Sequence, residues 1–187
     1  YVEVWVESRS IAGVVEGVCR DLAVSLYPTA GFSSITLTHQ AAVRVNGIVR
    51  KNHKPVRIIY IGDYDPAGVL IDTSAEQAYR RHLDPGIDMQ FNRIAVNLDQ
   101  INSLDLPAKP RKPGERRARH ITHTVEAETI PAWQMRELLR AAVESYLPGD
   151  AVRVTRLIED AERRGLERLA RSSELRRPAT MHVNRQG

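Results

Sequence analysis

Residues 56–72, VRIIYIGDYDPAGVLID, constrain the fold of this chain more than any other stretch. Five of the first six residues of this stretch are apolar and mostly β-branched, which is typical of a strand buried on both faces. Gly62 ends the apolar run, and two acids follow it, Asp63 and Asp65. The stretch therefore predicts two carboxylates at the end of a buried strand.

A helix is expected directly after these acids. Asp65 is its predicted N-cap and Pro66 its first residue, because proline lacks the backbone N–H that would have no partner there. The helix is expected to continue from residue 67 to about His82. Open α/β sheets bind ligands beyond the carboxyl ends of their strands, where this strand gives way to this helix.

Strands and helices alternate over the first half of the chain. The expected strands are 2–6, 24–28, 56–61 and 89–96, and the expected helices between them are 11–22, 35–49 and 67–82. This alternation predicts an α/β fold of Rossmann-like type, with a mostly parallel sheet covered by helices on both faces and right-handed crossovers.

The second half of the chain has a different character. Residues 98–104 predict a short helix, residues 107–123 form a basic loop without apolar periodicity, and residues 131–147 predict a longer helix. Asp150 is the expected N-cap of a last helix, followed by a basic tail. We expect one domain over residues 1–147, and a C-terminal helical extension with its tail over residues 148–187.

Composition is that of an ordinary globular protein, with 42% hydrophobic and 27% charged residues among 187. No apolar run approaches the roughly 20 residues that a membrane span needs, and no leader sequence opens the chain. The single cysteine, Cys19, fits a reducing compartment. These features predict a cytoplasmic protein that does not span a membrane.

A third acid, Glu7, closes the first predicted strand as Asp63 and Asp65 close the third. If these two strands are neighbours, the three carboxylates share one edge of the sheet, where their repulsion would favour binding of a cation. Oxygen ligands select hard ions, which points to Mg²⁺ or Mn²⁺, and such an ion can polarise a phosphodiester. A helix cap alone would explain Asp65 but not the other two acids.

A glutamate that closes the first strand, Gly31 after the second strand and an aspartate-any-aspartate turn after the third resemble the Toprim domain. This domain is shared by topoisomerases, bacterial primases, recombination proteins and OLD-type nucleases. The likeness is greatest to the topoisomerase VI A subunit and the meiotic double-strand-break protein. These carry a comparable turn, a later strand flanked by arginine, and an acidic stretch that residues 124–132, TVEAETIPA, resemble. The resemblance covers residues 2–147.

The resemblance implies roles for particular residues. Glu7 would act as general acid or base or join the metal shell, and Asp63 and Asp65 would be Mg²⁺ ligands. Glu126 would be a further acid, and a metal ligand, near the same site.

One feature of these relatives is not found. Topoisomerase VI and its relative cleave DNA with a tyrosine on an upstream winged-helix domain, whereas only six residues precede Glu7 here. Either water is the nucleophile, or the tyrosine belongs to a winged-helix partner or to a segment outside this sequence. Whether the chain forms a homodimer is left open.

Basic residues gather in the loop 107–123, where they are expected to bind phosphate groups without sequence preference. The alternative is an ordinary solvated loop. The candidate nucleic-acid-binding residues are Arg9, Lys109, Arg111, Lys112, Arg116, Arg117 and Arg119.

Together these patterns lead to a functional hypothesis, which is Mg²⁺-dependent cleavage of DNA phosphodiester bonds by a nuclease or nickase of Toprim type. Two alternatives stay open: a subunit of a topoisomerase VI-like or recombination enzyme, and a non-catalytic DNA-binding module. A receiver domain also clusters acids at strand ends, but no lysine follows Lys112 to complete such a site.

Overall fold

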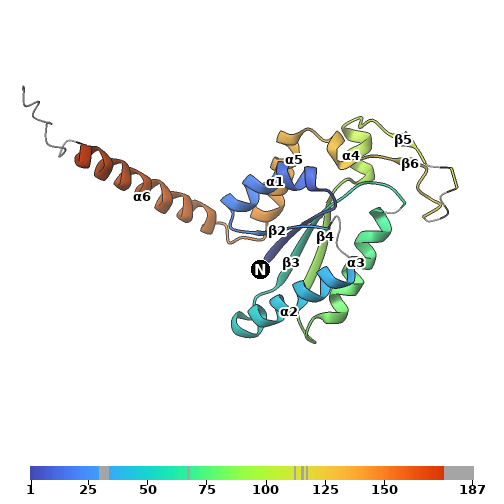
Figure 1. The fold of residues 1–187 in the computed structure, drawn as a ribbon, viewed down its shortest axis with the longest axis horizontal. Helices are drawn as coiled ribbons and strands as arrows, with labels where there is room; N and C mark the ends of the chain where they lie inside the picture. The colour runs from blue at the N-terminus through green and yellow to red at the C-terminus, as the bar shows by residue number, and fades with distance from the viewer. Residues whose placement is uncertain (30–33, 67, 112, 115, 117, 175–187) are drawn as a thin grey trace, which may run out of the picture. The chain divides into compact units, whose positions relative to one another are not determined.

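A four-stranded parallel sheet forms the centre of the unit made by residues 1–146 (Figure 1). The computed structural model describes residues 1–29, 34–66, 68–111, 113, 114, 116 and 118–174. The strands lie in the order β2-β1-β3-β4, and each pairs in parallel with its neighbours. Their bounds are β1 (Val2–Val6), β2 (Ser25–Pro28), β3 (Val56–Ile61) and β4 (Met89–Ala95). The predicted parallel sheet is confirmed, with β1 and β3 as adjacent central strands.

Helices cover both faces of this sheet. α1 (Arg9–Asp21) and α5 (Ala132–Glu144) lie on one face, and α2 (Ser34–Asn52) and α3 (Gly68–His82) lie on the other (Figure 1). α1 begins at a Ser8 cap, whose hydroxyl oxygen accepts a hydrogen bond from the Ile11 backbone N–H at 3.2 Å. The α/β fold expected from the sequence is therefore observed.

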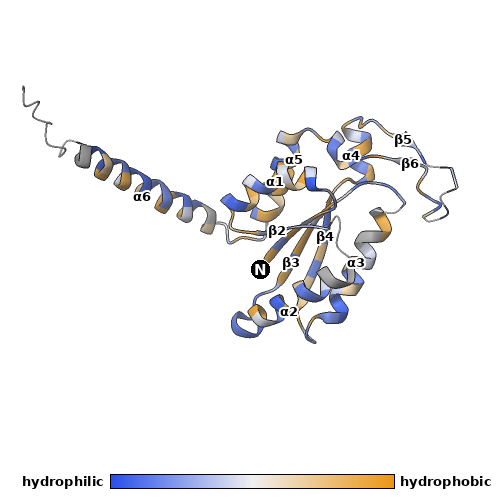
Figure 2. Cartoon of the chain, in the orientation of Figure 1, coloured by the Kyte–Doolittle hydropathy of each residue, from blue (hydrophilic) through white to orange (hydrophobic). Residues whose placement is uncertain are grey.

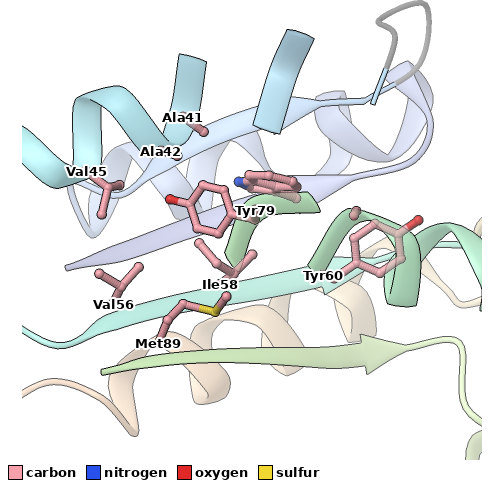
Figure 3. Packing of buried hydrophobic residues seen from close by; sticks show 10 residues of the cluster. Ala41, Ala42, Val45, Val56, Ile58, Tyr60, Tyr79 and Met89 are labelled. Atoms are coloured by element: carbon pink, nitrogen blue, oxygen red, sulfur yellow. The ribbon is translucent and has the colours of Figure 1, made fainter. Parts of the chain in front are cut away.

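The core between the sheet and α2 and α3 depends on alternate residues of the central strands (Figure 3). Ile58 and Tyr60 of β3 are fully buried in this core. Trp5 of β1 meets the ring of Tyr79 from α3 edge-on, with ring centroids 5.3 Å apart. Small side chains on α2, such as Ala42, allow the helix to approach the sheet closely. β3 is buried on both faces, as its apolar run predicted.

A buried carboxylate on β1 was not anticipated by the sequence analysis. Glu3 is completely buried. Its oxygens accept hydrogen bonds from the Tyr1 hydroxyl and the Trp5 indole N–H, both at 3.0 Å, and from the Arg44 guanidinium at 2.9 Å. A buried charge is tolerated when it is paired and hydrogen-bonded in this way. Glu3 therefore has a structural role in joining β1 to α2.

The two ends of the basic segment 107–123 form paired strands that the sequence analysis did not expect. β5 (Lys109–Pro110) and β6 (His123–Thr124) pair as a short antiparallel hairpin. The Arg111 guanidinium donates hydrogen bonds to the carbonyl oxygens of Ala118 and Ile121, both at 3.0 Å. The sequence analysis missed the hairpin because its strands are two residues long and carry no apolar alternation.

The remaining elements are a short helix α4 (Leu98–Ser103), a 3-10 turn η1 (Ala127–Thr129) and a long helix α6 (Ala151–Glu174). The chain forms two compact units, residues 1–146 and 147–187, and α6 belongs to the second. Figure 2 shows apolar residues recurring along α6; among them, Leu157, Leu166 and Leu169 are exposed. Within the described residues, no helix has the length and apolar character of a membrane span.

Candidate functional site at the carboxyl ends of the strands

Pairing of β1 with β3 brings Glu7 and Asp63 together. Val6 and Ile61 are partners in this pairing, and the Glu7 backbone N–H donates to the Ile61 carbonyl oxygen at 2.9 Å. The Asp63 backbone N–H in turn donates to Glu7 Oε2 at 3.0 Å. Two acids that are far apart in the sequence therefore meet at one edge of the sheet.

Asp65 holds the start of α3. Its Oδ1 accepts a hydrogen bond from the Gly68 backbone N–H at 2.5 Å, and its carbonyl oxygen accepts one from the Val69 N–H at 3.1 Å. These are the contacts of an N-cap residue, as the sequence predicted. We call residues 62–68 the acidic turn; residue 67 lies outside the described residues, as does Gly31.

Two glycines in the acidic turn make room for the carboxylates. A methyl group added at Gly62 would lie 2.7 Å from Glu7 Oε2 and from the Tyr60 hydroxyl oxygen. A methyl group added at Gly68 would overlap the Asp63 carbonyl oxygen and approach Asp65 Oδ1 to 3.2 Å. The sequence GDYDPAG thus needs glycine at both ends of the turn for steric reasons.

The segment after the hairpin is attached to the acidic turn by its backbone. Tyr64 and Val125 exchange two N–H to carbonyl hydrogen bonds, each 2.9 Å long. The Ala127 backbone N–H donates to Asp63 Oδ1 at 2.8 Å. This attachment places Glu126 and Glu128, which flank Ala127 in the sequence, beside the turn.

Glu126 and Glu128 have different partners. Glu126 forms an exposed ion pair with Lys109 Nζ at 2.8 Å, so the hairpin contacts the acidic edge directly. Glu128 Oε1 accepts hydrogen bonds from the hydroxyls of Ser8 and Ser10, at the start of α1. The sequence analysis proposed Glu126 but missed Glu128, because only the fold brings Glu128 to these serines.

Burial and mutual repulsion perturb the acids of this edge. Burial raises the pKa of Glu7, and the charges of Asp63 and Asp65 raise it further against the hydrogen bond from the Asp63 N–H. Burial also raises the pKa of Asp63, as do Glu128, Asp65 and Glu126. Burial acts to raise the pKa of Glu128, but hydrogen bonds from the hydroxyls of Ser10 and Ser8 bring this pKa below its usual value.

The donor set suits a hard divalent cation. The hydrogen bonds described above use one oxygen each of Glu7, Asp63 and Asp65. A cation would relieve the repulsion that raises the pKa values of Glu7 and Asp63. Over the described ranges, no group of three or more metal-ligating side chains is already arranged around one point. Mg²⁺ or Mn²⁺, which keep several waters as ligands, fit such a site better than a fully caged ion.

The sequence analysis also missed two residues next to the acidic turn, Tyr60 and Arg93. The Tyr60 hydroxyl reaches Glu7 Oε2 at 3.4 Å, and the Arg93 guanidinium stacks on the Tyr60 ring. The signal for Arg93 was a single arginine inside the fourth predicted strand, but its target could not be known without the fold.

The predicted phosphate-binding residues differ in exposure and in their contacts. Arg9 is exposed in the first turn of α1, and Arg116 and Arg119 are exposed in the hairpin loop. Arg111 is occupied with loop carbonyls, as described above. Lys112 and Arg117 lie outside the described residues.

Comparisons with family models, with curated proteins and with solved structures found no match to this chain. What the site can do therefore follows from its own residues.

Steric crowding at Gly62 gives a first prediction. Gly62→Ala is expected to displace the Glu7 carboxylate and to lower the free energy of unfolding by about 1–3 kcal/mol, because the new methyl group has no space. Urea unfolding followed by circular dichroism measures this change. The control is Gly13→Ala in α1, where no atom lies within 4 Å, and which should gain about 0.5–1 kcal/mol. Equal effects of the two changes would contradict the packing described here.

Raised pKa values give a second prediction. Because the pKa values of Glu7 and Asp63 are raised in the folded chain, the folded state binds protons more tightly than the unfolded state. The stability from these groups is present in acid and is lost as the pH rises through the folded-state pKa values. Asp63→Asn keeps the acceptor for Ala127 and removes one charge. It should raise the unfolding midpoint by about 2 °C or more at about pH 8, and change it little at about pH 4.

Glu137→Gln is the matched control for this change, since Glu137 is exposed on α5 and the substitution removes the same charge. Thermal unfolding at both pH values, without divalent ions, compares the two variants. A midpoint of Asp63→Asn below that of the unchanged chain at the higher pH would contradict the repulsion.

Proposed function

We propose that this protein cleaves DNA phosphodiester bonds with the help of Mg²⁺ or Mn²⁺, in the manner of Toprim nucleases. The observation that carries the proposal is the meeting of Glu7, at the end of β1, with the acidic turn that follows β3. The Toprim resemblance was based on this pattern: a glutamate that closes the first strand and an aspartate-any-aspartate turn that follows the third.

Each acid has a role in this proposal. Asp63 and Asp65 would hold the cation, which when bound polarises a phosphodiester and stabilises the leaving oxygen. Glu7 is half-buried and has a raised pKa, so it can exchange a proton nearer to neutral pH than an ordinary glutamate. Backbone N–H groups of Asp63 and Ala127 keep the Glu7 and Asp63 carboxylates in place.

The substrate class follows from the charges around this edge. Exposed arginines on the hairpin loop, Arg116 and Arg119, and Arg9 at the start of α1 can bind backbone phosphates. The ion pair between Lys109 and Glu126 links this basic hairpin to the acidic edge. A polyanion held by the arginines would thus lie close to the cation that the acids bind.

Water is the proposed nucleophile. Tyr60, the tyrosine whose hydroxyl contacts Glu7, is fully buried, and so is Tyr79. Neither can reach a phosphodiester in the folded chain.

Nicking of supercoiled plasmid DNA in Mg²⁺ or Mn²⁺ tests the proposal. Asp63→Asn and Asp65→Asn should each abolish nicking, because each removes a ligand charge while the amide oxygen can still accept the existing hydrogen bond. Asparagine is also a good N-cap, so α3 should remain intact in the second variant. Glu137→Gln should nick at the rate of the unchanged chain. Nicking that survives both aspartate changes would refute the proposed site.

A chain that does not nick DNA alone leads to the second candidate, a subunit that works with a tyrosine-bearing winged-helix partner. That candidate predicts covalent protein–DNA adducts only when the partner is added. Salt-sensitive binding without nicking or adducts would indicate a DNA-binding module.

A further inference from the structure

Arg93 contacts the acidic turn from beneath at several points. Its Nη1 donates hydrogen bonds to the carbonyl oxygens of Gly62 at 2.9 Å, Asp63 at 3.2 Å and Val96 at 3.4 Å. Its Nη2 donates to the carbonyl oxygen of Gly68 at 3.0 Å. One guanidinium therefore joins the first residues of the turn, its last residue and the end of β4.

A β-bulge sets the position of Arg93 in the sheet. Tyr60 pairs with Arg93, but the next residue, Ile61, pairs with Ala95, so that Ile94 is extra. Arg93 and Tyr60 lie side by side as pairing partners, with the guanidinium carbon 5.1 Å from the centre of the Tyr60 ring. Bulges of this kind often redirect a side chain next to a functional site.

α4 satisfies the backbone of the bulge from the other side. The Gln100 side chain donates to the Ile94 carbonyl oxygen at 2.7 Å, and the Asn97 side chain donates to the Arg93 carbonyl oxygen at 3.3 Å. The Gln100 side chain also accepts from the Asn97 N–H at 2.9 Å. The residues around Arg93 are thus held on both sides, which fixes where its guanidinium points.

Arg93 also brings positive charge to an edge that is otherwise acidic. Its guanidinium opposes the effects of burial, Asp63 and Asp65 on Glu7 and acts to lower the pKa of that carboxyl. Its planar fork reaches several carbonyl oxygens at once, which the single ammonium group of lysine cannot do in the same geometry.

We propose that Arg93 is the positioning residue of the acidic site: by binding the carbonyl groups of Gly62, Asp63 and Gly68, it holds the turn in the shape that keeps Glu7, Asp63 and Asp65 together. The importance of this role for catalysis rests on the proposed function. The contacts of Arg93 themselves are present without a cation. Arg93 does not touch the substrate in this proposal, and acts through the turn.

Arg57 provides a matched control. It lies on the adjacent strand β3, its side chain is 15% exposed, and it donates to the Val56 carbonyl oxygen and the Asp88 carboxylate, both at 2.9 Å. Its guanidinium also lies over a tyrosine ring, that of Tyr146. Loss of Arg57 should cost stability in a similar way, but should not affect the acidic turn.

The experiment compares Arg93→Met and Arg93→Lys with Arg57→Met and Arg57→Lys in the full chain. Two quantities are measured: the affinity for Mn²⁺, by electron paramagnetic resonance of the free ion, and the hydrogen-exchange rates of the Asp63 and Gly68 backbone amides, which bind Glu7 and Asp65, by NMR. Arg93→Met should weaken Mn²⁺ binding by about tenfold or more, as losses of supporting residues around metal sites do. It should also speed exchange of the Asp63 and Gly68 amides, because the turn loses the contacts that hold its carbonyl groups. Arg93→Lys should show both effects at smaller size, because a single ammonium group cannot reach the same carbonyl oxygens at once.

Both Arg57 variants should keep the Mn²⁺ affinity and the amide exchange rates of the unchanged chain, even where urea unfolding shows lower stability. The proposal is overturned if Arg93→Met leaves both quantities unchanged, or if Arg57→Met shifts them equally. If the unchanged chain binds no Mn²⁺, the proposed function fails, but the exchange rates of the Asp63 and Gly68 amides still decide the role of Arg93. If Arg93→Met does not fold, Arg93→Lys gives the same two readings.

Discussion

Parallel pairing of β1 with β3 is the interaction on which the rest of this site depends. It aligns Val6 with Ile61, so the residues that follow each strand emerge at the same edge of the sheet. The hydrogen bonds from the Glu7 N–H to Ile61 and from the Asp63 N–H to Glu7 continue this alignment past the ends of the strands. The acidic edge is thus a direct result of strand order. This order also brings like charges together in a half-buried place, where they repel one another.

The structure offsets this repulsion mainly by hydrogen bonds, and the charge of Arg93 counters it only in part. Backbone N–H groups bind Glu7, Asp63 and Asp65, and Arg93 donates to carbonyl oxygens of the turn. The pKa values of Glu7 and Asp63 remain raised, first through burial and then through neighbouring acids. Glu3, which is also buried, shows the contrast: it is paired directly with Arg44, and it has a structural role. Carboxylates whose pKa values stay raised by neighbouring acids are well suited to bind a cation from solution.

The sequence predicted those parts of the structure that local pattern determines. The apolar run of β3 and the glycine after it are local signals, and both lie where expected. Asp65 accepts the capping hydrogen bond as predicted, but α3 begins at Gly68 and not at Pro66. The hairpin, the approach of Glu128 to Ser8 and Ser10, and the reach of Arg93 beneath the turn depend on contacts between distant segments. A bulge in β4 directs Arg93, and the sequence holds no local signal for that bulge.

Paramagnetic broadening by Mn²⁺ tests most directly whether these acids share a cation. Trace Mn²⁺ added to nitrogen-15-labelled protein should broaden the backbone amide signals of Glu7, Asp63 and Asp65 first. Signals of Asp84 and Asp88, which precede β4 and pair with Arg50 and Arg57, should persist. Uniform broadening over all exposed acids, or broadening that leaves Glu7 unaffected while Asp84 and Asp88 disappear, would contradict the account.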